Sequence, residues 1–147
     1  MMRAGLVCLV GVLVLLGCGS SMQVSQDYDL RTSFQGFRSY SWIPATPGQT
    51  TGLTQGRIKQ AVNTEMVNKG LDPLPNSADL FVTYKVVADG SGKGTLTIQI
   101  LEAQSSRIIW SGWATGSIRY TDSPDQSVQY VNEVVSKIMA QYPPQQK

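Results

Sequence analysis

Residues Asp79–Val87 read DLFVTYKVV, and apolar side chains recur at every second position along most of this stretch. Successive side chains of a β-strand point to opposite faces, so this alternation predicts a strand that buries one face against a core. The side chains expected on the buried face are Leu80, Val82, Tyr84 and Val86. The opposite face, which carries Phe81, Thr83 and Lys85, is predicted to be the more polar one.

The segments that follow continue this pattern. Thr95–Glu102 alternates again, and the glycine-rich residues Ala88–Gly94 before it are typical of a hairpin loop. After a turn at Gln104–Ser106, the residues Arg107–Ser117 are rich in strand formers and are predicted to be the last strand. Consecutive strands with polar outer faces predict an antiparallel sheet that is covered on one side.

Two further strands and a helix are predicted upstream. Val24–Leu30 alternates roughly, and Ser39–Ile43 is rich in strand-forming residues. A helix is predicted to begin at about Leu53 and to end just before Gly70, because glycine is favoured just beyond a helix end. Its later apolar positions are spaced three and four apart, as on one helical face. The full apolar set is Leu53, Ile58, Ala61, Val62 and Met66.

A second helix is predicted near the end of the sequence. Ser123 and Gln126 match a capping box, and Pro124 fits the first helical position. The apolar stripe that follows consists of Val128, Val131, Val135, Ile138 and Tyr142. We therefore predict an α+β fold, a two-layer sandwich in which two helices pack on one face of a mostly antiparallel sheet of about five strands.

The amino-terminal segment has the anatomy of a lipoprotein signal. A basic start and a short apolar run end in Leu15-Leu16-Gly17-Cys18. We expect cleavage before Cys18 and acylation of both its thiol and the new amino terminus. Residues 1–17 are then the signal peptide, residues 18–23 a lipidated cysteine with a short tether, and residues 24–147 a single domain.

Two other interpretations of this segment fit less well. A spanning helix needs about 20 apolar residues, and the run from Leu6 to Leu16 is shorter. An unlipidated secretory signal usually ends in small residues, whereas the order Leu-Leu-Gly-Cys favours lipidation. The expected localisation is the cell envelope. If the source is Gram-negative, we expect the outer membrane facing the periplasm, because Gly19 and not Asp follows the cysteine.

Composition excludes several classes of function. The sequence contains no histidine, and its two cysteines are Cys8 in the signal and the acylated Cys18. Histidine-based triads and metal sites built on histidine or cysteine are therefore not expected. The net charge is +2 and the sequence has no basic stripe, so nucleic acid is not expected as a partner. We expect no catalytic residues, no metal and no cofactor.

Short motifs follow one another along the domain: Asp27-Tyr28-Asp29, Phe37–Trp42, Lys69-Gly70-Leu71, Ala78–Tyr84, Gly94–Ile98, Ile109–Ala114 and Tyr142-Pro143-Pro144. Their order resembles a bacterial lipoprotein family of the domain-of-unknown-function 4136 type. The resemblance covers most of the chain after the signal. It implies a lipid-anchored envelope protein, and it implies no activity.

Two motifs carry possible chemistry. Asp27 and Asp29 share a strand face, where they could bind a cation or act as acid and base, but a solvated edge strand is the simpler interpretation. Gly90–Thr95 contains a Gly-Lys-Gly-Thr sequence that suggests a phosphate-binding loop. Such a loop must lead into a helix, and a strand is predicted here, so a hairpin loop is favoured.

The strand Arg107–Ser117 supplies the candidate contact surface. On a regular strand Ile109 and Trp113 share one face, and Ile108, Trp110 and Ala114 are expected on the side of the core. We expect Ile109 and Trp113 to face away from the helices, where an apolar face needs a cover.

The function expected from these features is that of a non-enzymatic, lipid-anchored envelope module that binds or scaffolds another envelope protein. The alternative is a module that binds a small ligand or lipid in a pocket between helices and sheet. A hydrolase that uses only carboxylates is the third and least favoured hypothesis. An apolar cavity would favour the alternative, and a flat aromatic patch would favour the scaffold.

The lipid anchor can be tested at Cys18. A Cys18→Ser protein should leave the membrane fraction, because no acyl chain remains to hold it there. Mass spectrometry of the mature wild-type amino terminus should find an acylated Cys18. If the variant fractionates with membranes as the wild type does, the anchor lies elsewhere.

Overall fold

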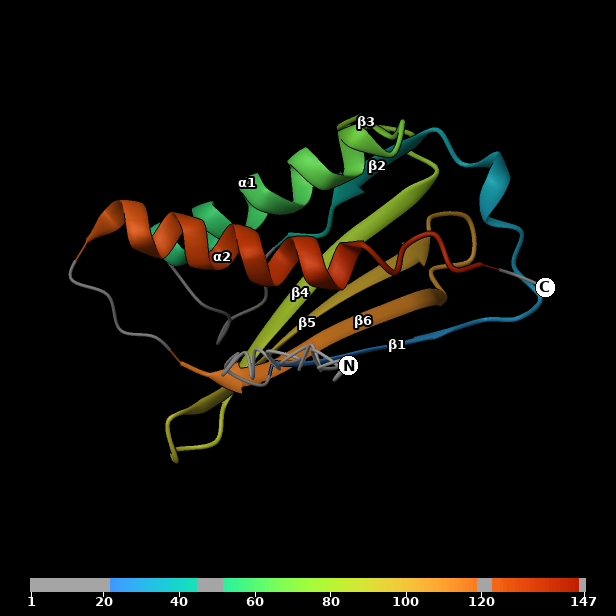
Figure 1. Ribbon diagram of the computed structural model, residues 1–147. Coiled ribbons are helices and arrows are strands. Elements are labelled where there is room, and N and C mark those ends of the chain that lie inside the picture. Colours follow the sequence, from blue (N-terminus) through green and yellow to red (C-terminus); the bar gives the residue numbers. More distant parts are fainter. Residues whose placement is uncertain (1–21, 45–51, 119–122, 146–147) are drawn as a thin grey trace, which may run out of the picture.

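The computed structural model describes residues 22–44, 52–118 and 123–145, which form a six-stranded sheet with two helices against it (Figure 1). In chain order the elements are β1 (Gln23–Tyr28), a 3-10 turn η1 (Phe34–Gly36), β2 (Ser39–Trp42), α1 (Leu53–Asn68), β3 (Asp72–Pro73), β4 (Leu80–Ala88), β5 (Lys93–Glu102), β6 (Ile108–Ser117) and α2 (Pro124–Met139). Both helices lie on the same side of the sheet in Figure 1, so the predicted α+β class is confirmed.

The sheet has six strands in the order β1-β6-β5-β4-β2-β3, and it is mixed. The pairs β1/β6, β6/β5 and β5/β4 are antiparallel, whereas β2 is parallel to both β4 and β3. The prediction of a mostly antiparallel sheet of about five strands is therefore confirmed only in part, because there are six strands and β2 adds two parallel pairs. Because α1 lies between β2 and β4 in the chain, it acts as a crossover that lets the two strands run the same way. The sequence does not reveal β3, which has only two residues, one of them proline.

The core lies between the helices and the inner face of the sheet. Leu80, Val82 and Tyr84 are buried there as predicted, and so are Ile98 and Ile100 on β5. The helices contribute Ile58, Ala61, Val62 and Met66 from α1 and Val134, Val135, Ile138 and Met139 from α2. Full burial of such a side chain stabilises by about 1.5–3 kcal/mol, so this layer holds helices and sheet together.

Three predicted core positions lie outside the core. Leu53 is 78% exposed, Val86 is 40% exposed and Val128 is 39% exposed. Leu53 and Val128 lie in the first two turns of their helices, and Val86 lies near the end of β4. Packing between the two layers is therefore less complete at the amino ends of the helices.

The start of α2 is predicted correctly, but its capping box is not formed. Pro124 is the first helical residue and Ser123 is the N-cap, with an extended backbone. The structure shows no side-chain capping hydrogen bond at this end. The Ser123 carbonyl oxygen accepts hydrogen bonds from the backbone nitrogen and the hydroxyl of Ser127, at 3.1 and 3.2 Å.

A bulge in β6 overturns the expected place of Ile109. Trp110 pairs with Ile100 and Ile108 with Leu101, so Ile109 is an extra residue between them. A bulge can turn two consecutive side chains to the same face, and both Ile109 and Trp110 are fully buried in the core. The prediction that Ile109 lies on the outer face is therefore wrong.

The inner face of β6 offers a test of this packing. The ring of Trp110 lies over Gly112, so a Cβ at Gly112 would overlap the ring and approach Ile138 Cγ2 to 2.8 Å. Gly112→Ala should lower the free energy of unfolding by about 1–3 kcal/mol, the usual cost of overpacking. Gly36→Ala is the matched control, because a Cβ there meets no atom within 4 Å. Urea unfolding measures both variants, and equal stabilities would contradict the tight packing at Gly112.

Candidate functional site

A pocket of about 380 Å³ opens between the two helices and the sheet. We call it the helix–sheet pocket. Its apolar wall includes Met22, Ile58, Leu96, Ala114, Val131 and Val134. These residues come from both helices, from β5 and β6, and from the position just ahead of β1. The pocket is the feature that the alternative functional hypothesis requires.

Small residues on the sheet create this pocket. Gly94 and Gly116 are paired across β5 and β6, and the nearby Ala114 offers only a methyl group. A Cβ on Gly116 would find Met22 as its nearest neighbour, at the ordinary contact distance of 3.7 Å. The inner face of the sheet therefore carries little side-chain volume at this point, and the helices do not fill the space that is left.

Both helices present their first two turns to the pocket. Thr54 and Arg57 belong to the start of α1, and Ser127 and Tyr130 to the start of α2. Figure 1 shows that the two helices begin on the same side of the domain. The pocket thus lies at one end of the helix layer, where Val86 from β4 also lines it.

The polar groups of the lining differ in how they are engaged. The Tyr130 hydroxyl donates a hydrogen bond to the Ser117 carbonyl oxygen at 2.8 Å. Arg57 is half-buried, and within the described part of the chain it takes part in none of the ion pairs. The described lining residues include no acidic side chain. The pocket therefore combines an apolar wall with one cation that has no counter-ion among the described residues.

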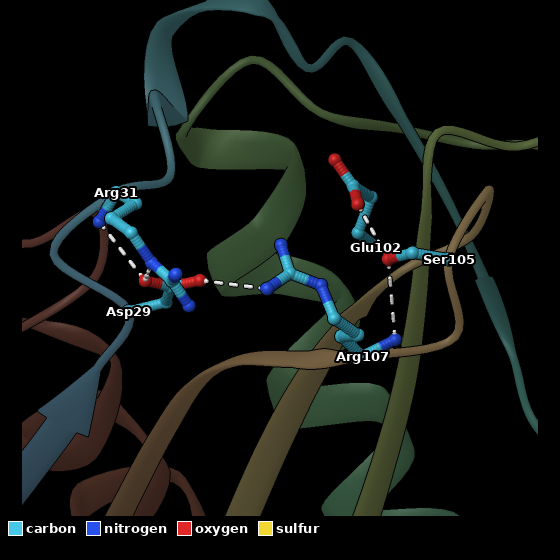
Figure 2. A network of polar contacts seen from close by, with 5 residues as sticks. All are labelled: Asp29, Arg31, Glu102, Ser105 and Arg107. Atoms are coloured by element: carbon cyan, nitrogen blue, oxygen red, sulfur yellow. Dashed lines mark hydrogen bonds and ion pairs between the residues drawn. The ribbon is translucent and has the colours of Figure 1, made fainter.

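The two predicted acidic residues do not form a common site. Asp27 accepts a hydrogen bond from the backbone of Tyr28 at 2.9 Å. Asp29 lies beyond the end of β1, where it accepts from the Arg31 backbone at 2.9 Å and pairs with Arg107 Nη1 at 3.1 Å (Figure 2). The hydrogen bond from the Arg31 backbone is the main cause that lowers the pKa of Asp29. Asp29 thus stays charged and ties the end of β1 to the start of β6.

The same region contains a second small network. Figure 2 shows Ser105 donating its hydroxyl hydrogen to Glu102 within the turn between β5 and β6. In the described ranges, no group of three or more His, Cys, Asp or Glu residues is placed to hold a metal ion. Nor is any helix in those ranges long and apolar enough to cross a membrane.

The loop Gly90–Thr95 belongs to a hairpin, as predicted. The β4/β5 pairing extends to Ala88 and Gly94, and β5 follows directly. Asp89 Oδ1 accepts hydrogen bonds from the backbone of Ser91 at 2.8 Å and of Lys93 at 3.3 Å. The loop is therefore closed by its own aspartate, and it leads into strand β5 and not into a helix.

Trp113 remains a candidate contact residue after the loss of Ile109. It lies on the face of the sheet away from the helices, between Ser25 on β1 and Thr97 on β5, and it is half-buried. Ile108 is 51% exposed beside the turn that precedes β6. The candidate surface thus keeps one of its two predicted residues.

The carboxylate of Asp79 links β2 to β4, and the sequence does not predict this link. Asp79 Oδ2 accepts hydrogen bonds from the backbone of Arg38 at 2.8 Å and from the backbone and hydroxyl of Ser39 at 3.0 and 3.1 Å. The Asp79 backbone in turn donates to the Ser39 hydroxyl at 3.0 Å. The hydrogen bond from the Arg38 backbone is the main cause that lowers the pKa of Asp79 below 3.8.

Comparisons with known proteins agree with this fold. The family model described as "Domain of unknown function (DUF4136)" matches residues 24–91 and 89–144. No curated protein matches the chain significantly. A PDZ domain protein from Parabacteroides distasonis is similar in structure, with a TM-score of 0.64 and 13% identity, over 87% of this chain and only 38% of that chain. The PelC dodecamer from Paraburkholderia phytofirmans has a TM-score of 0.55 and 11% identity, over 82% of this chain and 96% of that chain.

The Asp79 link predicts a pH dependence of stability. A group whose pKa is lowered on folding stabilises the native state above its unfolded pKa, and this stabilisation is lost as the pH falls through the folded pKa. Stability of the wild type should therefore drop on acidification below the usual pKa of 3.8. Near neutral pH, Asp79→Asn should have a lower free energy of unfolding than the wild type. On acidification, its free energy of unfolding should fall by less than that of the wild type. Urea unfolding along a pH series measures this, with the exposed Asp72→Asn as control, and parallel curves for wild type and Asp79→Asn would refute the link.

Proposed function

The chain belongs to the DUF4136 family, and we propose that it is a lipid-anchored, non-enzymatic envelope protein that binds an apolar ligand in the helix–sheet pocket. Ligand pockets are commonly about 300–1,000 Å³, mostly apolar, with a few polar groups that orient the ligand. At about 380 Å³, with an apolar wall and hydroxyl and guanidinium groups at the helix starts, the helix–sheet pocket matches this description. This pocket is the observation that carries the proposal.

The place of the pocket also supports binding close to a membrane. Met22 lines the pocket, and it follows the proposed acylated Cys18 by four residues. Four extended residues span at most about 14 Å, and two or more acyl groups give stable anchoring. The opening would therefore lie near the bilayer surface, and an apolar ligand from the membrane would cross little water.

The carboxylates give no support to a hydrolase. Asp29 is held by Arg31 and Arg107, and Asp79 by Arg38 and Ser39. A general acid at neutral pH needs a raised pKa, whereas both of these groups have lowered ones. We therefore propose a binding protein in the cell envelope, facing the periplasm from the outer membrane in a Gram-negative source.

A second candidate function uses the outer face of the sheet. Both helices lie on the other side (Figure 1), and the outer face carries the half-buried Trp113 and the exposed Ile108. These two apolar side chains suit contact with a partner protein of the envelope. This surface would serve a scaffold, and it is independent of the pocket.

A pocket-filling variant tests the first candidate. The mature Cys18→Ser protein should bind the neutral probe N-phenyl-1-naphthylamine with a rise in fluorescence. Gly116→Phe should weaken this binding about tenfold or more, because its side chain enters the pocket and a Cβ at Gly116 meets no closer atom than Met22 at 3.7 Å.

The control for this test is Gly36→Phe, which adds the same side chain at an exposed glycine with no atom within 4 Å of a Cβ. It should bind the probe as the unsubstituted protein does. If the protein binds no probe, or if Gly116→Phe binds it unchanged, the pocket proposal fails and the outer face is left as the candidate.

A further inference from the structure

We infer that the helix–sheet pocket selects a fatty acid, with the alkyl chain against the apolar wall and the carboxylate paired with Arg57. This inference rests on the proposed function, because it names the ligand of the same pocket. Three properties of the lining carry it: its charge, the hydroxyl of Thr54 and its size.

The charge of the lining favours an anion. Arg57 forms none of the ion pairs among the described residues, and no acidic side chain joins it in the described lining. A half-buried cation beside apolar surface loses hydration, and it gains most when an anion pairs with it. The planar guanidinium suits a carboxylate, because it can donate two parallel hydrogen bonds. A cationic ligand would meet only repulsion there.

The hydroxyl of Thr54 adds a donor for the same head group. Thr54 lies three residues before Arg57 on α1, so the two share one side of the helix. The Ser127 hydroxyl also lines the pocket, but it already donates to the Ser123 carbonyl oxygen at 3.2 Å. The amino ends of two helices carry partial positive charge, which weakly favours an anion. The exposed Asp125 offsets part of this charge, but it does not line the pocket.

The size of the pocket favours one alkyl chain. Its volume of about 380 Å³ lies near the lower end of the usual range of ligand pockets. The apolar side chains Ile58, Leu96, Val131 and Val134 form the wall against which one chain can lie.

Three ligands with the same alkyl chain test the head-group selectivity. Dodecanoate, dodecanol and dodecyltrimethylammonium are used to displace N-phenyl-1-naphthylamine from the mature Cys18→Ser protein. Dodecanoate should bind about tenfold more tightly than dodecanol, and the ammonium compound should bind most weakly. Gly116→Phe should weaken binding of all three.

Variants of Arg57 then locate the selectivity. Arg57→Gln should bind dodecanoate and dodecanol equally, while Arg57→Lys should keep part of the preference because the charge remains. Lys93→Gln is the control, since Lys93 is an exposed cation next to Gly94 that does not line the pocket. It should keep the full preference for dodecanoate.

The outcomes separate the two proposals. If the unsubstituted protein binds dodecanol as tightly as dodecanoate, the inference is overturned and the apolar pocket function stands. If Arg57→Gln keeps the preference, Arg57 is not the head-group contact and the assignment is wrong. If no alkyl ligand and no probe binds, the proposed function itself fails.

Discussion

The packing of Trp110 against Gly112 is the contact on which the layered structure depends. Trp110 is fully buried, and its Nε1 donates a hydrogen bond to Gln26 Oε1 on β1 at 2.9 Å. Its ring meets the ring of Tyr142 edge to face, with centroids 5.3 Å apart. One side chain therefore joins β6, β1 and the segment after α2. The hydrogen bond matters because an indole nitrogen buried without an acceptor is costly.

Two glycines on one face of β6 have opposite consequences. At Gly112 the missing side chain is replaced by the Trp110 ring, so the layers are tightly packed there. At Gly116 the nearest atoms to a Cβ belong to Met22, at 3.7 Å, and the glycine lines the helix–sheet pocket. The bulge at Ile109 belongs to the tightly packed end, because it sends both Ile109 and Trp110 into the core. The same strand is therefore tightly packed against the helices at one end and lines the pocket at the other.

The sequence predicts those parts of the fold that local periodicity controls. The alternation of Leu80, Val82 and Tyr84 and the spacing of Ala61, Val62 and Met66 identify the buried faces correctly, because each pattern lies within one element. Parallel pairing of β2 depends on a crossover, which local patterns do not report. The prediction for Ile109 fails for a similar reason, because the extra residue of a bulge can be recognised only from its pairing with the partner strand.

The candidate site is harder to predict than the fold. Its lining comes from both helices and several strands, and no motif joins Met22, Arg57 and Val131 in the sequence. The signal that was present is the pairing of small residues, Gly94 and Gly116, on strands that elsewhere carry large inward side chains. Recognising it requires the register between the two strands, which the sequence does not supply.

The energetics of empty space bear on why the pocket is there. A closed cavity costs about 24 cal/mol per Å³, so 380 Å³ would cost about 9 kcal/mol. That is comparable with the whole stability of a typical domain, about 5–15 kcal/mol, so such a space has to be open to solvent or filled by a ligand. Packing demands a glycine at Gly112, where any Cβ collides, but makes no such demand at Gly116, where a Cβ meets only ordinary contacts. Under the proposed function, the glycine at position 116 keeps this space open for a ligand.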